Sequence, residues 1–303
     1  MAVKVLVTGA SGFIGRATCE ELGRRGHEVV ALVRRSGSEP PGTRALVGDM
    51  TDAASLQEAV PSENADAVVH LAAEIASQRD ARKIREVNVE GTRRLLEACM
   101  TDGAPRFVLA STVVTGEAHG ELLEPDNPLP VETPYGRSKQ EAERIVRESG
   151  LDAVVVRPSH VYGPGGWYAE ELVKRLRQPG RFAVVGQGDN WWDVVRVEDV
   201  ATALADAAER APAGAVYHVV DDDPITFYDF VALTARELGV GPPRRIPVWL
   251  AKLAAGSNAV RAAVRSARSS NARIKVELGW LPRYPTAAEG VPDAIAKLAQ
   301  NRH

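Results

Sequence analysis

Cysteine is nearly absent from this chain of 303 residues, since only Cys19 and Cys99 occur. Each lies within a predicted amphipathic helix, and neither has a CxxC partner or a nearby histidine. Isolated cysteines of this kind are typical of small buried side chains and not of metal ligands. We therefore expect no metal site.

An excess of charge of one sign is also missing, because the net charge is −3. Arginines alternate with carboxylates, as in the run from Glu141 to Arg144, so no continuous basic stripe is predicted and no nucleic-acid partner is expected. No apolar run approaches the roughly 20 residues that span a bilayer. The chain enters a predicted strand at once, without a signal-peptide pattern, which predicts a cytoplasmic globular protein.

Short apolar segments alternate with helical patterns through the first half of the chain. The predicted strands lie near residues 3–7, 28–33, 44–47, 66–71, 106–110 and 152–157. This alternation predicts an α/β fold with a doubly wound parallel sheet of the Rossmann type, in which ligands bind at the carboxyl ends of the strands. Residues 1–160 would form the dinucleotide-binding domain.

Smaller elements follow residue 160. The pattern predicts short strands at 182–185, 194–197 and 216–220, and helices near 199–209, 226–238, 247–266 and 286–300. We expect residues 161–303 to form mostly a small, discontinuous substrate-binding lobe, with segments near 194–220 returning to the main sheet.

A glycine-rich turn follows the first predicted strand, in the sequence Thr8-Gly9-Ala10-Ser11-Gly12-Phe13-Ile14-Gly15. Glycines 9, 12 and 15 leave the backbone accessible to a diphosphate, and the next helix directs free N–H groups and the positive end of its dipole toward the same place. Strand, glycine turn and helix in this order predict a dinucleotide site.

Arg34 and Arg35 follow the second predicted strand, where an acidic residue would bind a free ribose 2′-hydroxyl. Arginine at this point favours a 2′-phosphate, so we expect NADP, with NAD possible, and Arg16 after the last glycine adds positive charge. The alternative is that Arg34 and Arg35 only solvate a loop.

Tyr135 and Lys139 lie four residues apart in a predicted helix, which places a phenol and an ammonium on one face. A nearby positive charge favours the phenolate, so this spacing predicts that Lys139 lowers the pKa of Tyr135 from its ordinary value of about 10. The pair suits general acid/base chemistry on an alcohol or carbonyl.

Seven segments in order make the chain resemble the extended short-chain dehydrogenase/reductase family, in its epimerase/dehydratase type and its 3β-hydroxysteroid dehydrogenase-like branch. These segments are Thr8–Gly15, Gly48–Met50, His70–Ala73, Asn88–Thr92, Ala110–Gly116, Tyr135–Lys139 and Arg157–Pro164. The resemblance runs over nearly the whole chain, but fold membership does not identify the substrate.

The resemblance implies a Ser-Tyr-Lys site for hydride transfer between a nicotinamide and a ketone or secondary alcohol. It implies catalytic or supporting roles for Ser111, Tyr135, Lys139 and Asn88. It implies cofactor contacts for Gly9, Ser11, Gly12, Phe13, Ile14, Gly15, Arg34, Arg35, Asp49, Met50, Leu71, Ala72, Ala73, Lys139, Pro158 and His160. Substrate contacts are expected for Thr112, His160, Trp191 and Trp192.

Two positions depart from the pattern of sugar-nucleotide enzymes. Trp192 stands where those enzymes commonly place an arginine, and His160 stands where they often have asparagine. An indole cannot replace a guanidinium fork against a diphosphate, so we expect a less polar small-molecule substrate. The alternative is that Trp191 and Trp192 pack the two parts of the protein together.

Residues 244–275 are rich in arginine around the apolar run 248–251. This segment could be a membrane-surface helix, a phosphate-gripping lid or, as we favour, the solvated face of a mobile cap. If its arginines face the site, a sugar-nucleotide substrate becomes the better prediction.

Two other functions stay open from the sequence. One is a sugar-nucleotide epimerase or dehydratase that regenerates its cofactor within one turnover, and the other is a non-catalytic NADP sensor. A homodimer through the helices near 79–101 and 134–149 would fit the family, although these helices could equally cover the sheet.

Overall fold

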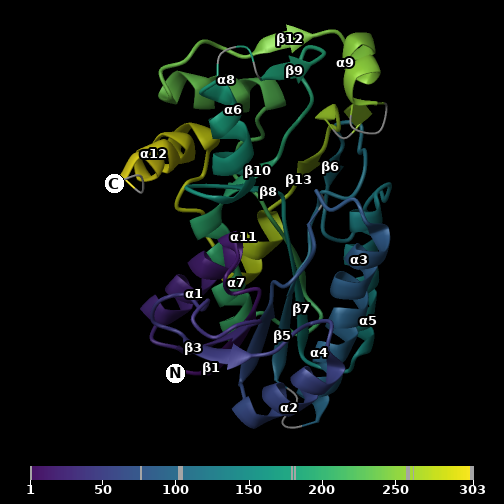
Figure 1. Cartoon of the computed structure of the whole chain (residues 1–303), viewed down its shortest axis with the longest axis vertical. Coiled ribbons are helices and arrows are strands. Elements are labelled where there is room, and N and C mark those ends of the chain that lie inside the picture. Colours follow the sequence, from purple (N-terminus) through teal and green to yellow (C-terminus); the bar gives the residue numbers. More distant parts are fainter. Residues whose placement is uncertain are drawn as a thin grey trace.

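The computed structural model describes residues 2–300 except 76, 102–104, 179, 181, 257–259 and 262. Its centre is a seven-stranded parallel sheet in the order β11-β7-β5-β4-β1-β2-β3 (Figure 1). These strands are β1 (Lys4–Thr8), β2 (Glu28–Val33), β3 (Arg44–Val47), β4 (Ala67–His70), β5 (Arg106–Ala110), β7 (Ala153–Pro158) and β11 (Val216–Val219). The order reverses at β1, which is where doubly wound sheets bind ligands.

Helices cover both faces of this sheet, which confirms the predicted Rossmann-type fold. One face packs against α1 (Phe13–Arg24), α7 (Val197–Arg210) and α11 (Ala272–Leu278). The other packs against α2 (Ala53–Glu63), α4 (Gly91–Met100) and α5 (Pro134–Glu148). The short helix α3 (Ala81–Arg85) and the π-helical turn η1 (Glu86–Glu90) lead into α4.

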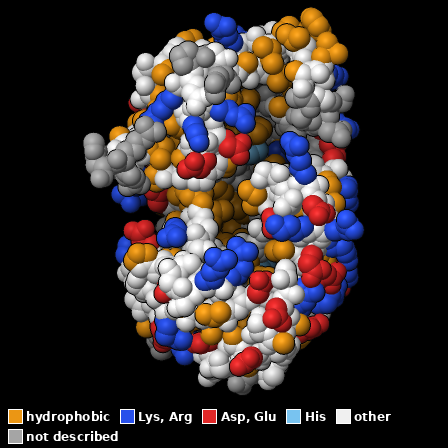
Figure 2. Space-filling view, viewed as in Figure 1, with side chains coloured by type: hydrophobic (Ala, Val, Ile, Leu, Met, Phe, Trp, Pro, Cys, Tyr) orange, Lys and Arg blue, Asp and Glu red, His pale blue; other side chains and the backbone are white. Residues whose placement is uncertain are grey.

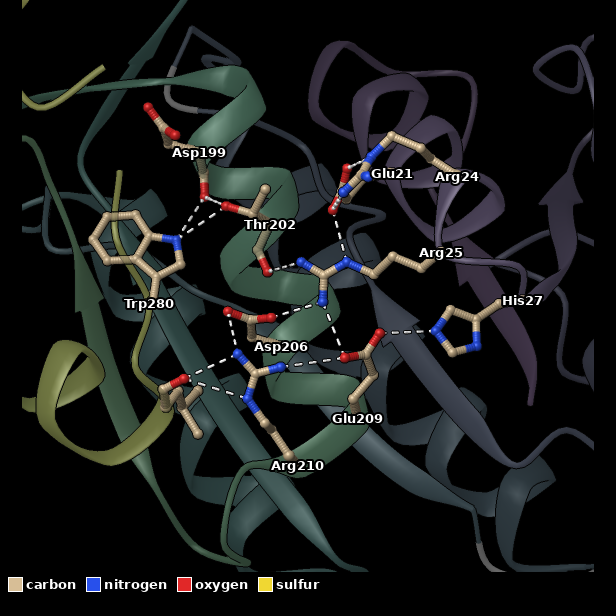
Figure 3. A network of polar contacts seen from close by, with 11 residues as sticks. Glu21, Arg24, Arg25, His27, Asp199, Thr202, Asp206, Glu209, Arg210 and Trp280 are labelled. Atoms are coloured by element: carbon tan, nitrogen blue, oxygen red, sulfur yellow. Dashed lines mark hydrogen bonds and ion pairs between the residues drawn. The ribbon is translucent and has the colours of Figure 1, made fainter. Parts of the chain in front are cut away.

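Helices α1 and α7 are joined by a network of charged side chains (Figure 3). Arg25 at the end of α1 donates to Glu21 at 2.7 Å, to Asp206 at 2.7 Å and to Glu209 at 3.0 Å. The indole N–H of Trp280 donates to Thr202 of α7 at 3.0 Å. Residues from both ends of the chain therefore fix the same helix.

The remaining elements gather above the sheet in Figure 1, and we call them the upper lobe. They are β8 (His160–Tyr162), η2 (Tyr168–Val173), α6 (Lys174–Leu176), β9 (Ala183–Val185), β10 (Val194–Arg196), α8 (Phe227–Glu237), β12 (Arg244–Ile246), α9 (Val248–Ala255) and α12 (Ala287–Gln300). Their core is built around Tyr162, Tyr168, Phe230 and Val291. Strands β6 (Leu122–Leu123) and β13 (Arg268–Ser269) pair beside it.

The second half of the chain crosses between the two parts. The strand predicted near 216–220 is β11 of the main sheet, and α7 covers that sheet, whereas β10 pairs with β8 outside it. The division into a dinucleotide-binding and a substrate-binding part stays a prediction.

One predicted helix is wrong in extent. The pattern predicts a helix over 247–266, but α9 ends at Ala255 and is followed by Gly256 with a φ of 83°. Glycine tolerates this positive φ, which terminates a helix. Residues 257–259 and 262 of the predicted helix lie outside the described residues. Helix α11 and the short strands β6, β8, β12 and β13 are not among the sequence predictions.

None of the helices in the described part of the chain has the length and hydrophobicity needed to cross a membrane. Among the same residues, no group of three or more His, Cys, Asp or Glu side chains is arranged to hold a metal ion. Cys19 and Cys99 are buried, and both have free thiols.

A buried ion pair connects α5 to the main sheet. The Arg157 guanidinium on β7 donates to both carboxylate oxygens of Glu143, at 2.9 and 2.7 Å, and the two side chains are 7% and 2% exposed. In the sequence Glu143 belongs to a run in which arginines alternate with carboxylates, and nothing in that run marks it as buried. Two residues earlier on α5, Glu141 pairs with Arg144 at the surface.

Glu143→Ala is expected to lower the free energy of unfolding by about 3–5 kcal/mol, because it leaves the Arg157 charge buried and unpaired. Glu141→Ala removes an exposed pair on the same helix and should cost less than about 1 kcal/mol. Urea unfolding of the two variants beside the wild type measures both. If both variants lose the same free energy of unfolding, the buried pair of Glu143 and Arg157 contributes no more to stability than the exposed pair.

Candidate active site

The glycine turn lies at the carboxyl edge of the sheet and fits tightly against the segment after β4. A Cβ added to Gly9, whose φ is +67°, would lie 2.7 Å from the Ala72 nitrogen, and one added to Gly15 would lie 2.2 Å from the Gly9 carbonyl oxygen. Both glycines are therefore required by backbone packing. This packing places Leu71, Ala72 and Ala73 beside the turn.

Gly12 is less tightly packed than Gly9 and Gly15. A Cβ there would meet only the Gly9 carbonyl oxygen, at 3.1 Å, and Gly12 is the exposed N-cap of α1, without any side-chain capping bond. The first N–H groups of α1 are thus directed outward with no side chain to satisfy them. Such an open helix N-terminus beside a glycine turn fits the diphosphate of a dinucleotide.

Phe13 and Ile14 begin helix α1, and Ser11 is exposed in the turn before it. The Phe13 ring lies against residues 163–166, where a Cβ on Gly165 would be 2.9 Å from its Cδ2. The ring of Phe13 therefore packs on the loop after β8, which brings the first and second halves of the chain together.

Asp49 and Met50 follow β3 at the same edge. The Asp49 carboxylate accepts hydrogen bonds from the Thr51 backbone N–H and hydroxyl, both at 2.8 Å. These bonds, together with the charge of Arg34, lower the pKa of Asp49. Arg34 and Arg35 are exposed after β2, so Arg34 lies near the predicted adenosine end.

A chain of buried hydrogen bonds runs beneath the strand ends. His70 bonds Thr8 Oγ1 through Nδ1 at 2.7 Å and Thr92 Oγ1 through Nε2 at 2.9 Å. The Thr92 hydroxyl donates to the Asn88 carbonyl, and Thr8 Oγ1 accepts from the N–H groups of residues 71 and 72. Thr8 must therefore donate to Nδ1, and Nε2 carries the imidazole proton. Burial, with Lys139 nearby, lowers the pKa of His70 to about 3, in agreement with a neutral ring.

Asn88 extends this chain to the helix of the Tyr–Lys pair. Its side-chain amide N–H donates to the Ser138 hydroxyl at 2.9 Å and to the Glu74 carbonyl at 3.0 Å, and its oxygen accepts from the Glu74 N–H at 2.7 Å. Ser138 in turn donates to the Tyr135 carbonyl at 2.8 Å. Asn88 therefore positions the first turn of α5.

Ser111 and Lys139 lie together at the end of β5. Lys139 Nζ donates to the carbonyl of Ala110, the residue before Ser111, at 2.6 Å. The Ser111 hydroxyl is buried and has no hydrogen-bond partner among the described residues. A buried polar atom without a partner is uncommon in native proteins and is consistent with a ligand oxygen binding there.

Thr112 is engaged differently, because its hydroxyl donates to the Pro158 carbonyl at 3.2 Å and accepts from the Val114 N–H at 2.9 Å. The Pro158 carbonyl also accepts from the Val113 N–H. Thr112 and Pro158 thus hold the ends of β5 and β7 together.

The expected effect of Lys139 on Tyr135 is wrong for the protein itself. Burial raises the pKa of Tyr135 to about 12, and burial lowers the pKa of Lys139 to about 8, partly opposed by Glu143. The loss of solvation on burial is the cause of the Tyr135 shift, and the charge of Lys139 is not among its causes. Tyr135 is accordingly a neutral phenol at neutral pH, with a proton to donate.

His160 and Trp192 form a stacked pair above the strand ends, with ring centroids 3.6 Å apart and planes tilted by 18°. His160 Nδ1 donates to the Asp193 carbonyl at 2.9 Å, so Nε2 is its acceptor. Burial and the charge of Arg265 lower the pKa of His160 to about 3. The Trp192 ring also lies against Phe227 of α8, with ring centroids 4.7 Å apart, so Trp192 packs two elements of the upper lobe, β8 and α8, together.

Trp191 lies outside that stack. The Arg268 guanidinium lies 5.3 Å from the centroid of its ring, and the backbone N–H of Trp191 donates to the Ser266 hydroxyl at 3.1 Å. Both tryptophans thus have packing contacts, and a substrate contact for either of them stays a prediction.

The basic segment 244–275 is not uniformly solvated. Arg265 is buried and donates to the carbonyl oxygens of Val113 and Gly116, in the loop that follows Ser111. Arg273 and Lys275 instead pair with Asp126 and Asp222 near the surface. Arg265 is not among the site residues predicted from the sequence, because no local signal distinguishes it from its basic neighbours.

The molecular surface is hollowed between the sheet and the upper lobe, and Figure 2 shows hydrophobic side chains lining this hollow with basic ones near its rim. The fold is of the Rossmann type, and its open helix N-terminus beside the glycine turn is the kind of place at which such folds bind dinucleotides.

The chain belongs to the NAD dependent epimerase/dehydratase family, whose model matches residues 5–220, and it is an enzyme. It is 32% identical to a 3-diazoavenalumate denitrifying reductase of Streptomyces over 95% of this chain and 99% of the relative. It is 32% identical to a 2-alkyl-3-oxoalkanoate reductase of Stenotrophomonas maltophilia, over 80% of this chain and 77% of the relative. The structure of a Thermus thermophilus UDP-glucose 4-epimerase in complex with NAD is similar, with a TM-score of 0.83 and 26% identity. The match covers 98% of this chain and 99% of the epimerase chain.

Lys139→Met is expected to change how stability depends on pH. The folded pKa of Lys139 is about 8, against about 10.4 in an unfolded chain, so the unfolded state binds more protons between these values. Below pH 8 the folded protein holds Lys139 as a buried ammonium, which lowers the free energy of unfolding. As the pH rises toward 10 the buried amine loses its proton, and this destabilisation disappears. The wild type should therefore gain about 2–3 kcal/mol relative to the variant over this interval.

Urea unfolding at pH 7.5, 9 and 10 measures this gain, with Lys174→Met, at an exposed position, as the control. If the difference in free energy of unfolding between wild type and Lys139→Met is the same at all three pH values, burial does not lower the pKa of Lys139.

Proposed function

We propose that this enzyme transfers a hydride between a nicotinamide cofactor and a ketone or secondary alcohol, and that Ser111, Tyr135 and Lys139 form its catalytic site. The observation that carries the proposal is the buried Ser111 hydroxyl without a partner, next to the carbonyl that Lys139 binds. A substrate oxygen there would satisfy this hydroxyl and lie at the edge where the glycine turn would hold the cofactor.

The residues that would hold the dinucleotide lie along the carboxyl edge of the sheet. The turn from Gly9 to Gly15 would bind the diphosphate, Asp49 and Met50 the adenine, and residues 71–73 with Pro158 and His160 the nicotinamide half. A nicotinamide dinucleotide, when bound, supplies or accepts the hydride. The protein contributes orientation and proton transfer.

Tyr135 is the proposed acid in reduction. Its raised pKa keeps the phenol protonated at neutral pH, so it can donate to the oxygen that becomes an alkoxide. Ser111 would donate a second hydrogen bond to that oxygen and stabilise its charge. Lys139, held near Ala110, would bind the nicotinamide ribose and favour the phenolate after proton transfer.

NADP is the proposed cofactor form, with NAD as the alternative. Arg34 and Arg35 are exposed after β2, where a 2′-phosphate would extend, and Arg34 lies close enough to Asp49 for its charge to lower the pKa of that carboxyl. Neither arginine forms an ion pair with a described residue. A guanidinium can bind such a phosphate through two hydrogen bonds.

A less polar substrate than a sugar nucleotide is proposed because Trp192 fills the position against His160 with an aromatic ring. Two relatives at 32% identity are reductases by name, one of them acting on a 2-alkyl-3-oxoalkanoate. The Thermus thermophilus epimerase keeps the sugar-nucleotide reaction as the second candidate. Net oxidation of NADPH separates the two, because an epimerase regenerates its cofactor. Any enzymatic turnover argues against a pure sensor.

Homodimerisation through residues near 79–101 and 134–149 stays a prediction. The inner faces of α4 and α5 cover the sheet, which leaves only their outer faces for a partner.

Tyr135→Phe is expected to lower turnover by roughly 10²- to 10⁴-fold, because it removes the proton donor, while NADPH binding is unchanged. Stopped-flow oxidation of NADPH with a panel of ketones, sterols and sugar nucleotides measures the first effect, and fluorescence titration measures the second. Tyr228→Phe in the upper lobe is the control. Near-normal turnover of Tyr135→Phe would refute the assignment.

Arg34→Ala and Arg35→Ala are expected to weaken NADPH binding about tenfold to a hundredfold, because each removes a charged hydrogen-bond donor to the 2′-phosphate. NADH binding should change little. Titration of both cofactors against wild type and Arg93→Ala, an exposed arginine of α4, gives the comparison. Tighter binding of NADH than of NADPH by the wild type would overturn the proposal.

A further inference from the structure

Helix α9 is apolar but almost entirely exposed. Its side chains Val248, Trp249, Leu250 and Leu253 are 38%, 64%, 43% and 78% exposed, and of residues 248–254 only Ala251 is buried. Packing against the residues that the structure describes therefore does not explain the hydrophobicity of α9. Figures 1 and 2 place it at the outer end of the upper lobe, where hydrophobic side chains gather on the surface.

Basic residues flank this helix in the sequence. Residues 238–276 contain eight Arg or Lys and no Asp or Glu, although the whole chain has a net charge of −3. Next to α9, Arg244, Arg245 and Lys252 are exposed, and none of them forms an ion pair with a described residue. Arg245 instead stacks on Tyr228, with its guanidinium 3.7 Å from the ring centroid. Unpaired positive charge thus flanks exposed hydrophobic side chains.

We propose that α9 with Arg244, Arg245 and Lys252 is a docking surface for an anionic lipid bilayer. An indole and aliphatic side chains suit the boundary between headgroups and acyl chains, and nearby cations attract anionic headgroups. Trp249 and Leu253 lie four residues apart on one side of the helix, so they would enter the bilayer together.

A second copy of the chain is a poorer occupant of this surface. Pairing two copies across a twofold axis would bring like patches, and hence like charges, together. A bilayer offers both an apolar interior and negative charge. The proposal goes beyond the reductase assignment and does not depend on it.

The experiment is cosedimentation of the full-length wild-type chain with phosphatidylcholine vesicles that contain either no phosphatidylglycerol or about a third of it. We expect binding to the anionic vesicles to be at least about tenfold tighter and to weaken as salt increases. Trp249→Ser with Leu253→Ser should lower this binding at least about tenfold, because the inserted apolar area is removed.

Val276→Ser with Leu281→Ser is the matched control, since these side chains are 84% and 75% exposed away from α9, and it should bind as the wild type does. Arg244→Ser with Arg245→Ser leaves the apolar side chains in place and should remove the preference for anionic vesicles. NADPH binding and thermal unfolding of each variant verify folding.

Three outcomes would overturn the proposal. One is equal binding to both kinds of vesicle, or none. Another is unchanged vesicle binding by the Trp249 and Leu253 variant. The third is a concentration-dependent oligomer, seen by sedimentation without vesicles, that the same variant dissociates while vesicle binding is absent.

Discussion

A run of buried hydrogen bonds connects the segments on which the proposed site depends. It passes from Thr8 at the glycine turn through His70 at the end of β4 to Thr92 and Asn88, and from Asn88 to Ser138 on α5. Each donor in it has one acceptor, which fixes the tautomer of the neutral imidazole. A shift of any one segment would leave a buried polar group unsatisfied, so the cofactor edge and the helix of the proposed acid are held in one geometry.

The upper lobe contributes to the same geometry from the other side. Arg265 binds two carbonyl oxygens of the loop that follows Ser111, and Trp192 lies between His160 and Phe227. Polar groups near the strand ends are thus largely used for internal bonds. The Ser111 hydroxyl is a buried polar group without such a bond among the described residues, and the indole nitrogen of Trp192 is another.

The sequence predicts the strands of the main sheet well, because their apolar runs are bounded by glycines and polar residues that mark strand ends. It does not separate Glu143 from Glu141, since the burial of Glu143 depends on Arg157 in a distant strand. Likewise, no local pattern distinguishes Arg265, whose partners lie about 150 residues earlier. The direction of the Tyr135 pKa shift could not be predicted either, because it depends on how deeply the folded chain buries the phenol.

The placement of β11 limits how this protein could be recombined. β11 joins the outer edge of the main sheet beside β7, although upper-lobe elements separate the two strands in the sequence. A chimera that exchanged the chain after β7 for that of a relative would also replace β11 and α7, and with them part of the core of the main sheet. Grafting a new substrate specificity therefore requires several junctions, which favours point substitutions over segment exchange as the route by which such lobes diverge.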